Sequence, residues 1–399
     1  MAPFTSSAGA FGAFSDDRAG GLVLNPHRHF DEALDPPVHG GNRVWAAAIA
    51  GCPPEELIDF SASINPLGPP QSILEAIANP QEALRAYPDP TYGALRRAIA
   101  DHHGIDPSWV MPGNGAAELL TWAARDLAAL DAVYVPVPAF GDYGRALRAF
   151  GARVKSWLLV GGGDRDWLAL PGGPKIGAIV NNPHNPTGFL WSAAVLESLL
   201  KRLALVVVDE AFMDFLPDER GWSLVDRLER YPNLVIVRSL TKFYSMPGLR
   251  LGYAIAHPDR LRRWNSWRDP WSVNSLAALA GVAALADRSF QQQTWDWLPP
   301  SRDRLALALR NLAPDTFKPF ASAANFLLVR SAIPGPWLQR DLLRRDRLLV
   351  RDCLSFPELG SQYLRLAVRT DPENQRLIRA LVAAYRRFVE EGASDGTMG

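Results

Sequence analysis

Cysteine is scarce in this chain of 399 residues, which contains only Cys52 and Cys353. Two isolated cysteines provide neither a disulfide framework nor a zinc site, so we expect no metal centre and a reduced, cytoplasmic environment. Long apolar runs are absent too, since none approaches the roughly 20 residues that a membrane helix needs. The 42 Lys and Arg residues balance 42 Asp and Glu residues. This balance gives no reason to expect nucleic acid or a membrane as a partner.

Lysine is also scarce, with five residues against 37 arginines. Only Lys242 has neighbours that suggest chemistry: it follows the apolar run 234–237 and lies close in sequence to Ser239 and Arg250. A lysine at the end of a buried strand loses its proton readily, and the neutral amine forms a Schiff base with an aldehyde. Ser239 and Arg250 could hold a phosphate beside it. An aldehyde that carries a phosphate is pyridoxal phosphate, which we therefore expect as the cofactor.

A different reading of the same residues is a serine hydrolase. Ser239 and Lys242 match the Ser-x-x-Lys motif of the penicillin-binding enzymes, which also require Ser-Asp-Asn and Lys-Thr-Gly. Neither tripeptide occurs in the sequence. The hydrolase interpretation is therefore disfavoured.

The order of apolar and amphipathic segments predicts an α/β fold. Short Val/Ile/Leu runs alternate with helical patterns up to about residue 255, which favours a mostly parallel sheet covered by helices on both faces. From about residue 271 long helices and short strands predict a smaller α+β domain. We expect a mobile N-terminal extension (1–36), an arm that contributes to the substrate site and the small domain (37–72), a large cofactor-binding domain (73–288) and a small C-terminal domain (289–392).

Several polar residues stand where predicted strands end, the edge at which open α/β sheets bind ligands. Gly115 precedes a helix whose free N–H groups favour phosphate, although Gly-Asn-Gly alone is more often a turn. Asp209 follows four aliphatic residues and needs a partner such as a pyridinium N–H or a structural cation. Phe140 could stack on a ring or belong to the core. Asn185 could donate to a phenolate oxygen or cap a helix.

Taken in order, these residues resemble a known superfamily. The segments Asn185-Pro186-Thr187-Gly188, Asp209-Glu210-Ala211-Phe212 and Ser239-x-x-Lys242 with Arg250-Leu251-Gly252 are similar to motifs of fold-type I pyridoxal-phosphate enzymes of the aminotransferase superfamily. The resemblance covers roughly residues 38–390. It implies a large domain built on a mostly parallel sheet, a smaller α+β domain and a homodimer.

The resemblance also implies a role for each matching residue. Lys242 would link covalently to the cofactor, and Asp209 would keep its ring nitrogen protonated. Phe140 would stack on the cofactor ring and Asn185 would bind the ring oxygen, with Phe212 beside the ring. The cofactor phosphate would be held by Gly115, Ala116, Ser239, Arg250 and, from the other subunit, Tyr87.

A narrower resemblance is carried by three further segments. His39-Gly40-Gly41-Asn42, Asp59 to Gly68 and Pro270-Trp271-Ser272-Val273-Asn274 are similar to the L-threonine-O-3-phosphate decarboxylases of cobalamin biosynthesis, relatives of the histidinol-phosphate aminotransferases. This implies decarboxylation of threonine phosphate to aminopropanol phosphate. The substrate's phosphate and carboxylate would be bound by Arg351, Arg365, His39, Asn65 and Asn185.

Two positions depart from the commoner aminotransferase pattern. Phe212 stands where most aminotransferases have a tyrosine that donates to the ring oxygen, and this fits the decarboxylase better. Ala116 can offer only its backbone N–H to a phosphate. A histidinol-phosphate or related amino-acid-phosphate aminotransferase is the alternative enzyme. A cofactor-binding regulator is a third possibility, but residues 1–36 are too short for the DNA-binding domain that such a regulator usually carries.

Overall fold

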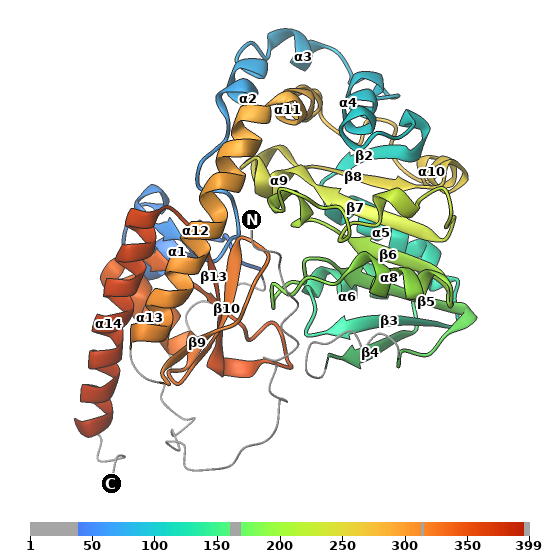
Figure 1. The fold of residues 1–399 in the computed structure, drawn as a ribbon. Coiled ribbons are helices and arrows are strands. Elements are labelled where there is room, and N and C mark those ends of the chain that lie inside the picture. Colours follow the sequence, from blue (N-terminus) through green and yellow to red (C-terminus); the bar gives the residue numbers. More distant parts are fainter. Residues whose placement is uncertain (1–38, 160–168, 313–314, 395–399) are drawn as a thin grey trace.

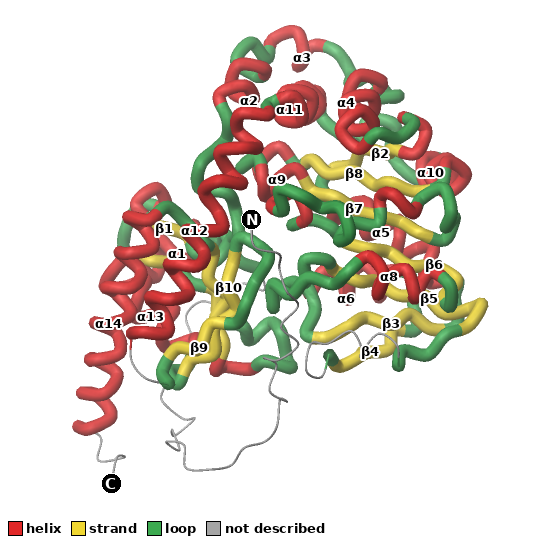
Figure 2. The backbone as a smooth tube through the Cα atoms, viewed as in Figure 1, coloured by secondary structure: helices red, strands yellow, loops and turns green. Residues whose placement is uncertain are grey.

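The computed structural model describes residues 39–159, 169–312 and 315–394. The expected N-terminal extension, residues 1–36, lies outside the described residues. The remaining chain forms two lobes, which Figure 1 colours along the sequence and Figure 2 colours by secondary structure. Within the described ranges, none of the helices combines the length and apolar character needed to cross a bilayer.

The larger lobe is built on a seven-stranded sheet. Its strand order is β2-β8-β7-β6-β5-β3-β4, and β8 is antiparallel to both of its neighbours while the other pairs are parallel. The expected mostly parallel α/β sheet is thus confirmed. In chain order the strands are β2 (Val110–Asn114), β3 (Ala132–Val137), β4 (Val154–Leu158), β5 (Gly173–Asn181), β6 (Leu203–Asp209), β7 (Leu234–Ser239) and β8 (Leu251–Ala256).

Helices cover both faces of this sheet. Alternate residues of one strand belong to two different cores: Val206 and Val208 face one, Leu205 and Val207 the other. This period of two is why the central strands read as continuous apolar runs. The helices of the lobe are α2 (Gln71–Ala76), α3 (Gln81–Arg85), α4 (Gly93–His103), α5 (Ala116–Ala128), α6 (Gly141–Ala149), α8 (Ala193–Leu200), α9 (Leu240–Phe243), α10 (Pro258–Asn265) and α11 (Ser275–Ala286).

The smaller lobe contains a four-stranded antiparallel sheet of order β12-β13-β10-β9. Residues of the N-terminal arm also belong to this lobe, because β1 (Ile58–Asp59) pairs in parallel with β11 (Leu348–Leu349) in a separate two-stranded sheet. Its other elements are α1 (Arg43–Ala50), α12 (Arg288–Leu312), β9 (Phe317–Pro319), β10 (Phe326–Ser331), α13 (Gly335–Asp346), β12 (Arg351–Asp352), β13 (Tyr363–Ala367) and α14 (Asp371–Ser394).

Helix α12 runs from one lobe to the other (Figure 1). It contains Pro299 and Pro300 in its interior. On the N-terminal side of the prolines, the Trp295 indole donates to the Asp214 carbonyl of the large lobe at 2.9 Å. On the C-terminal side, the Ser301 hydroxyl donates to the Asp371 carboxylate of the small lobe at 3.1 Å. The two halves of one helix therefore bind different lobes.

Candidate active site

The carboxyl ends of three neighbouring parallel strands bring polar side chains to one edge of the sheet. Asn181 ends β5, Asp209 ends β6 and Ser239 ends β7, and all three are buried. Asn181 and Asp209 are direct register partners. The Asn181 amide donates to the Asp209 carbonyl at 2.7 Å. Polar side chains thus line the edge where this class of sheet binds ligands.

Lys242 follows directly, in the short helix α9. Burial, together with the positive charges of Arg365 and Arg250, lowers the pKa of Lys242 to about 8, while Asp209 opposes this shift. A lysine with such a pKa is partly neutral near pH 7, as condensation with an aldehyde requires. The expectation that Lys242 is the reactive amine therefore has an electrostatic basis in the structure.

Asp209 is almost fully buried beside two donors. The Tyr143 hydroxyl donates to its Oδ2 at 2.6 Å, and the Ala211 N–H donates to its Oδ1 at 3.0 Å. Burial raises the pKa of Asp209, while these two hydrogen bonds and Lys242 lower it. Each carboxylate oxygen can accept more than one hydrogen bond, so Asp209 can also receive the N–H of a pyridinium. Sequence reasoning missed Tyr143, which is buried in α6.

Asn185 is joined to the small lobe through Arg365. The Arg365 Nη1 donates to Asn185 Oδ1 at 2.6 Å, and its Nη2 donates to the Ser61 carbonyl of the N-terminal arm at 2.9 Å. The Asn185 N–H donates to Asn181 Oδ1 at 2.6 Å. One arginine thus links the arm, the small lobe and the loop after β5.

Two predicted substrate arginines lie side by side. Arg351 and Arg365 are register partners in the antiparallel pair β12–β13, and their exposed fractions are 4% and 9%. Burial and the charge of Arg351 lower the pKa of Arg365 to about 10. The Nε of Arg365 has no hydrogen-bond partner within the described parts of the chain. Like charges opposed in a ladder are unfavourable, and an anion bound between the two arginines would stabilise the pair.

His39 brings the N-terminal arm over the large lobe. Its ring centroid lies 5.7 Å from that of Phe140, the residue that precedes α6. Partial burial lowers the pKa of His39; Asp142 raises it, and Arg351 and Arg365 lower it. His39 therefore lies within electrostatic reach of both arginines, as expected for a substrate contact.

Phe212 packs into an aromatic stack beside the same arginine. Its ring meets Phe326 edge to face, with centroids 5.0 Å apart, and the Arg365 guanidinium carbon lies 5.3 Å from the Phe326 centroid. Phe212 is 5% exposed. A buried hydroxyl at this position would need a partner, whereas the phenyl ring needs only packing.

A phosphate cup forms where β2 meets α5. Gly115 caps α5 with a φ of 75°, which glycine adopts without strain, and Ala116 opens the helix, whose first N–H groups have no partner within the helix itself. A Cβ on Gly115 would lie 2.5 Å from Arg250 Nη2, so the guanidinium sits directly over this turn. Ser239 hydrogen-bonds Thr241 through their hydroxyls at 2.7 Å. Helix terminus, arginine and hydroxyls together suit a phosphate.

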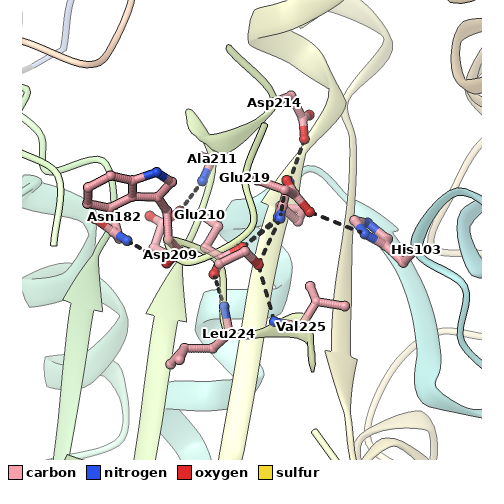
Figure 3. A network of polar contacts seen from close by, with 12 residues as sticks. His103, Asn182, Asp209, Glu210, Ala211, Asp214, Glu219, Leu224 and Val225 are labelled. Atoms are coloured by element: carbon pink, nitrogen blue, oxygen red, sulfur yellow. Dashed lines mark hydrogen bonds and ion pairs between the residues drawn. The ribbon is translucent and has the colours of Figure 1, made fainter. Parts of the chain in front are cut away.

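Behind the strand ends lies a buried ionic network that sequence reasoning did not identify. Arg238, fully buried next to Ser239, contacts the carboxylates of Glu210, Asp214 and Glu219 at 2.6–2.9 Å. Figure 3 shows Glu210 beside Asp209, with Glu219 reaching toward His103. Burial raises the pKa of Glu210 to about 7 against the opposing charge of Arg238. The network ties the ends of β6 and β7 together and so fixes Asp209 relative to Ser239.

Two predicted residues lie elsewhere. Tyr87 is 79% exposed and stacks on Trp271, with ring centroids 4.5 Å apart. Asn65 is fully buried behind the lysine helix: its amide donates to the Phe243 carbonyl at 2.9 Å and to Thr294 Oγ1 at 2.8 Å. Its Oδ1 accepts from Leu67 N–H. These contacts give Asn65 a place in the scaffold of the site rather than on its surface.

The residues present fit pyridoxal phosphate. They supply a partly neutral amine, a buried carboxylate with spare acceptor capacity and a phosphate cup, all along one edge of the sheet. Fold and site together define a fold-type I pyridoxal-phosphate enzyme. The chain matches the family described as aminotransferase class I and II over residues 55–381, and it belongs to this family.

Individual relatives narrow the similarity. The chain is 40% identical to the threonine-phosphate decarboxylase of Salmonella typhimurium over 88% of its own length and 97% of that protein. It is 35% identical to the histidinol-phosphate aminotransferase of Symbiobacterium thermophilum, over 82% and 91% of the two chains. Its fold matches the solved histidinol-phosphate aminotransferase of Clostridium acetobutylicum with a TM-score of 0.76 at 28% identity, covering 83% and 100% of the chains.

Proposed function

We propose that this chain is a pyridoxal-phosphate-dependent carboxy-lyase that converts L-threonine O-3-phosphate to aminopropanol phosphate, a step of cobalamin biosynthesis, as a cytoplasmic homodimer. The observation that carries the substrate class is the buried pair Arg351 and Arg365. Threonine phosphate carries two anionic groups, and two arginines in a partly dry site match them. The similarity to threonine-phosphate decarboxylases supports the same substrate.

The bound cofactor supplies an electron sink for the bond that breaks at the substrate's Cα. The chain must hold this cofactor in its electron-accepting form, and Asp209 would do so by placing its buried carboxylate at the ring nitrogen. Lys242 provides the amine that holds the cofactor and can carry a proton to or from Cα. Its low pKa lets it act near neutral pH.

Orientation of the substrate decides which bond is cleaved. The arginines approach from the small lobe, and Arg365 also binds Asn185, which we place at the cofactor's ring oxygen. Anions held by Arg351 and Arg365 are therefore placed at a fixed position relative to the ring. For decarboxylation the carboxylate must stand out of the ring plane. The absence of a hydroxyl on Phe212 removes one polar contact near the ring oxygen and fits this arrangement.

The deciding experiment supplies the purified holoenzyme with threonine phosphate and measures carbon dioxide and the amine product by mass spectrometry. We expect one carbon dioxide per aminopropanol phosphate, no 2-oxo acid, and a cofactor that keeps its aldehyde oxidation level. Stoichiometric pyridoxamine phosphate with a keto product, or amino transfer from glutamate to the histidinol-phosphate ketone, would instead establish an aminotransferase.

Variants of the two arginines test the substrate class within the same assay. Arg351→Met and Arg365→Met should each cost about 2–4 kcal/mol in kcat/KM, as removal of one partner of a buried charge pair does. Arg330→Met provides a matched control, because Arg330 lies on the same sheet but is exposed. Unchanged kcat/KM in both buried-site variants would contradict this placement of the substrate.

A further inference from the structure

A carboxylate lies unexpectedly close to the phosphate cup. Glu118 belongs to the first turn of α5, the helix whose N-terminus forms the cup. Its Oε2 accepts from the Asn114 N–H at 2.6 Å, and a Cβ on Gly113 would lie 3.1 Å from the same oxygen. The negative charge is therefore packed against the two residues that lead into Gly115.

This carboxylate and a cofactor phosphate would compete for the same helix end. An anion in the first turn is stabilised by the helix dipole, and so is a phosphate at the terminus. Two anions at one terminus repel each other when neither is compensated. Glu118 accepts hydrogen bonds from the Asn114 N–H and, at 3.0 Å, from the Trp122 indole, but both donors are neutral. Arg250 lies against Gly115, at the proposed phosphate position, so a second cation would compensate the charge of Glu118.

Arg268 is placed to be that cation. Its side chain is 3% exposed, and its Nη1 lies 3.6 Å from Glu118 Oε1. The same Nη1 donates to the Pro112 carbonyl of β2 at 2.5 Å. Arg268 therefore contacts both the strand that leads into the cup and the carboxylate behind it.

The segment that follows Arg268 is anchored to the same region. It contains the motif 270–274, to which the resemblance assigned no role. The Val273 N–H donates to the buried Tyr92 hydroxyl at 3.0 Å, and the Asn274 amide donates to the Leu249 carbonyl at 3.0 Å, next to Arg250. The segment that carries Arg268 is thus joined to the residue before Arg250, and both arginines lie close to the residues 112–115.

We propose that Arg268 is a positioning residue for the cofactor phosphate: it neutralises Glu118 and fixes the end of β2, so that the turn at Gly115 and Ala116 attracts an anion. This inference rests on the cofactor placement proposed above. It assigns Arg268 an electrostatic role that depends on the phosphate and not on the ring.

The test compares binding of two probes, pyridoxal phosphate and pyridoxal, to the apoprotein by absorbance titration. Arg268→Met should raise the Kd for pyridoxal phosphate about tenfold, the order expected for an uncompensated charge near a binding site. It should leave the Kd for pyridoxal, which lacks the phosphate, unchanged. Arg268→Lys keeps the charge and should retain most of the affinity, and Glu118→Gln added to Arg268→Met should restore it.

Three outcomes would overturn the proposal: a Kd for pyridoxal phosphate that Arg268→Met does not change, equal weakening of both probes, or weakening that Glu118→Gln does not reverse. Arg250→Met tests the cofactor placement separately. If that placement is wrong, Arg250→Met will also leave the Kd for pyridoxal phosphate unchanged. Arg268→Gln replaces Arg268→Met if the latter does not fold, with thermal unfolding of each apoprotein as the folding check.

Discussion

At the scale of single residues, the site depends on charged groups whose proton affinity the fold has changed. Lys242 is the clearest case, because burial and two arginines make its protonated form less stable than in water. In Asp209 two effects oppose each other, because burial raises its pKa and hydrogen bonds lower it. The chemistry of both residues therefore depends on neighbours that come from other elements.

The low pKa of Lys242 predicts a pH dependence of stability. Between the folded pKa of about 8 and the ordinary value of 10.5, the unfolded chain binds more protons than the folded one. The free energy of unfolding of the apoprotein should therefore rise as the pH rises through this window. Denaturant titrations at pH 7 to 10 measure it. The rise should be lost in Lys242→Met and kept in Lys201→Met, an exposed lysine; a flat profile in the unaltered protein would contradict the shifted pKa.

The hydroxyl of Tyr143 should be visible in the pH profile of the reaction. Tyr143→Phe removes a 2.6 Å hydrogen bond that stabilises ionised Asp209, so the pKa of Asp209 should rise. The acid limb of kcat/KM against pH should then move to higher pH, and kcat should fall about tenfold, as for a lost bond to a charged group. Tyr134→Phe, whose ring packs on Trp157, is the matched control. An acid limb that stays in place would assign Tyr143 to packing alone.

Sequence reasoning found some of these residues and not others for a physical reason. Lys242 and Asp209 stand at the ends of apolar strands, a position that identifies them without any contact information. Tyr143 lies inside an ordinary amphipathic helix, and its role depends on a partner 66 positions away. Arg238 stands one residue before the end of β7 as one arginine among many, and only the fold shows the three carboxylates around it.

At the scale of elements, the N-terminal arm is what completes the site. Its strand β1 adds to the small lobe, its Ser61 carbonyl receives Arg365, and Asn65 supports the helix that carries Lys242. The Asn65 N–H also donates to the Lys242 carbonyl at 3.0 Å. An arm with these contacts fixes the reactive lysine relative to both lobes.

Variants of Asn65 distinguish a positioning role from the substrate contact implied by the resemblance. Asn65→Asp keeps the acceptor for Leu67 and removes the donor to Phe243 and Thr294. We expect kcat to fall while KM changes little, together with about 1–3 kcal/mol of lost stability. Asn233→Ala is the control, because the Asn233 amide likewise makes two hydrogen bonds, to the Leu200 and Leu203 carbonyls, but precedes β7 at the end of the strand opposite to Ser239. A large rise in KM at constant kcat would favour direct substrate contact.

Elements were predicted well where an apolar period is long and poorly where it is short. The apolar runs before Asp209 and at 234–237 lie in β6 and β7, and the helix expected after Gly115 is α5. The short elements α3 and β9 and the arginine-rich α10 were not predicted, since they offer few apolar positions from which to read a period. The antiparallel direction of β8 could not be predicted from its composition either, because β8 is as fully buried as the parallel strands of the sheet. The domain boundaries stay predictions.

At the scale of the whole molecule, the exposed pair of Tyr87 and Trp271 fits the proposed homodimer. Two large aromatic rings that stack on each other and remain 79% and 42% exposed are unusual on a free surface. In the proposed dimer Tyr87 serves the cofactor phosphate of the other subunit.

Mixing inactive subunits tests that assignment. Tyr87→Ala and Lys242→Ala proteins, refolded together, should form a heterodimer with one intact site. Each such heterodimer should have up to half of the activity of a wild-type dimer. The purified heterodimer of wild type and the double variant should have no intact site, because its only Lys242 faces an altered Tyr87. If the heterodimer of wild type and the double variant is active and that of Tyr87→Ala and Lys242→Ala is inactive, Tyr87 acts within its own subunit. Equal activity of the two heterodimers would mean that Tyr87 does not act at the site, and a fully active monomer in sedimentation would exclude the dimer.

The proline pair in α12 has a mechanical consequence. Prolines at 299 and 300 remove two backbone donors from the helix interior, so bending resistance is lowest there. One half of the helix is fastened to the large lobe by Trp295 and the other to the small lobe by Ser301. A change in the angle between the lobes is therefore concentrated at this point, as in a hinge between two leaves. Arg351 and Arg365 belong to the small lobe and Lys242 to the large lobe. Rotation about residues 299–300 therefore sets the distance between the two arginines and the Lys242 amine.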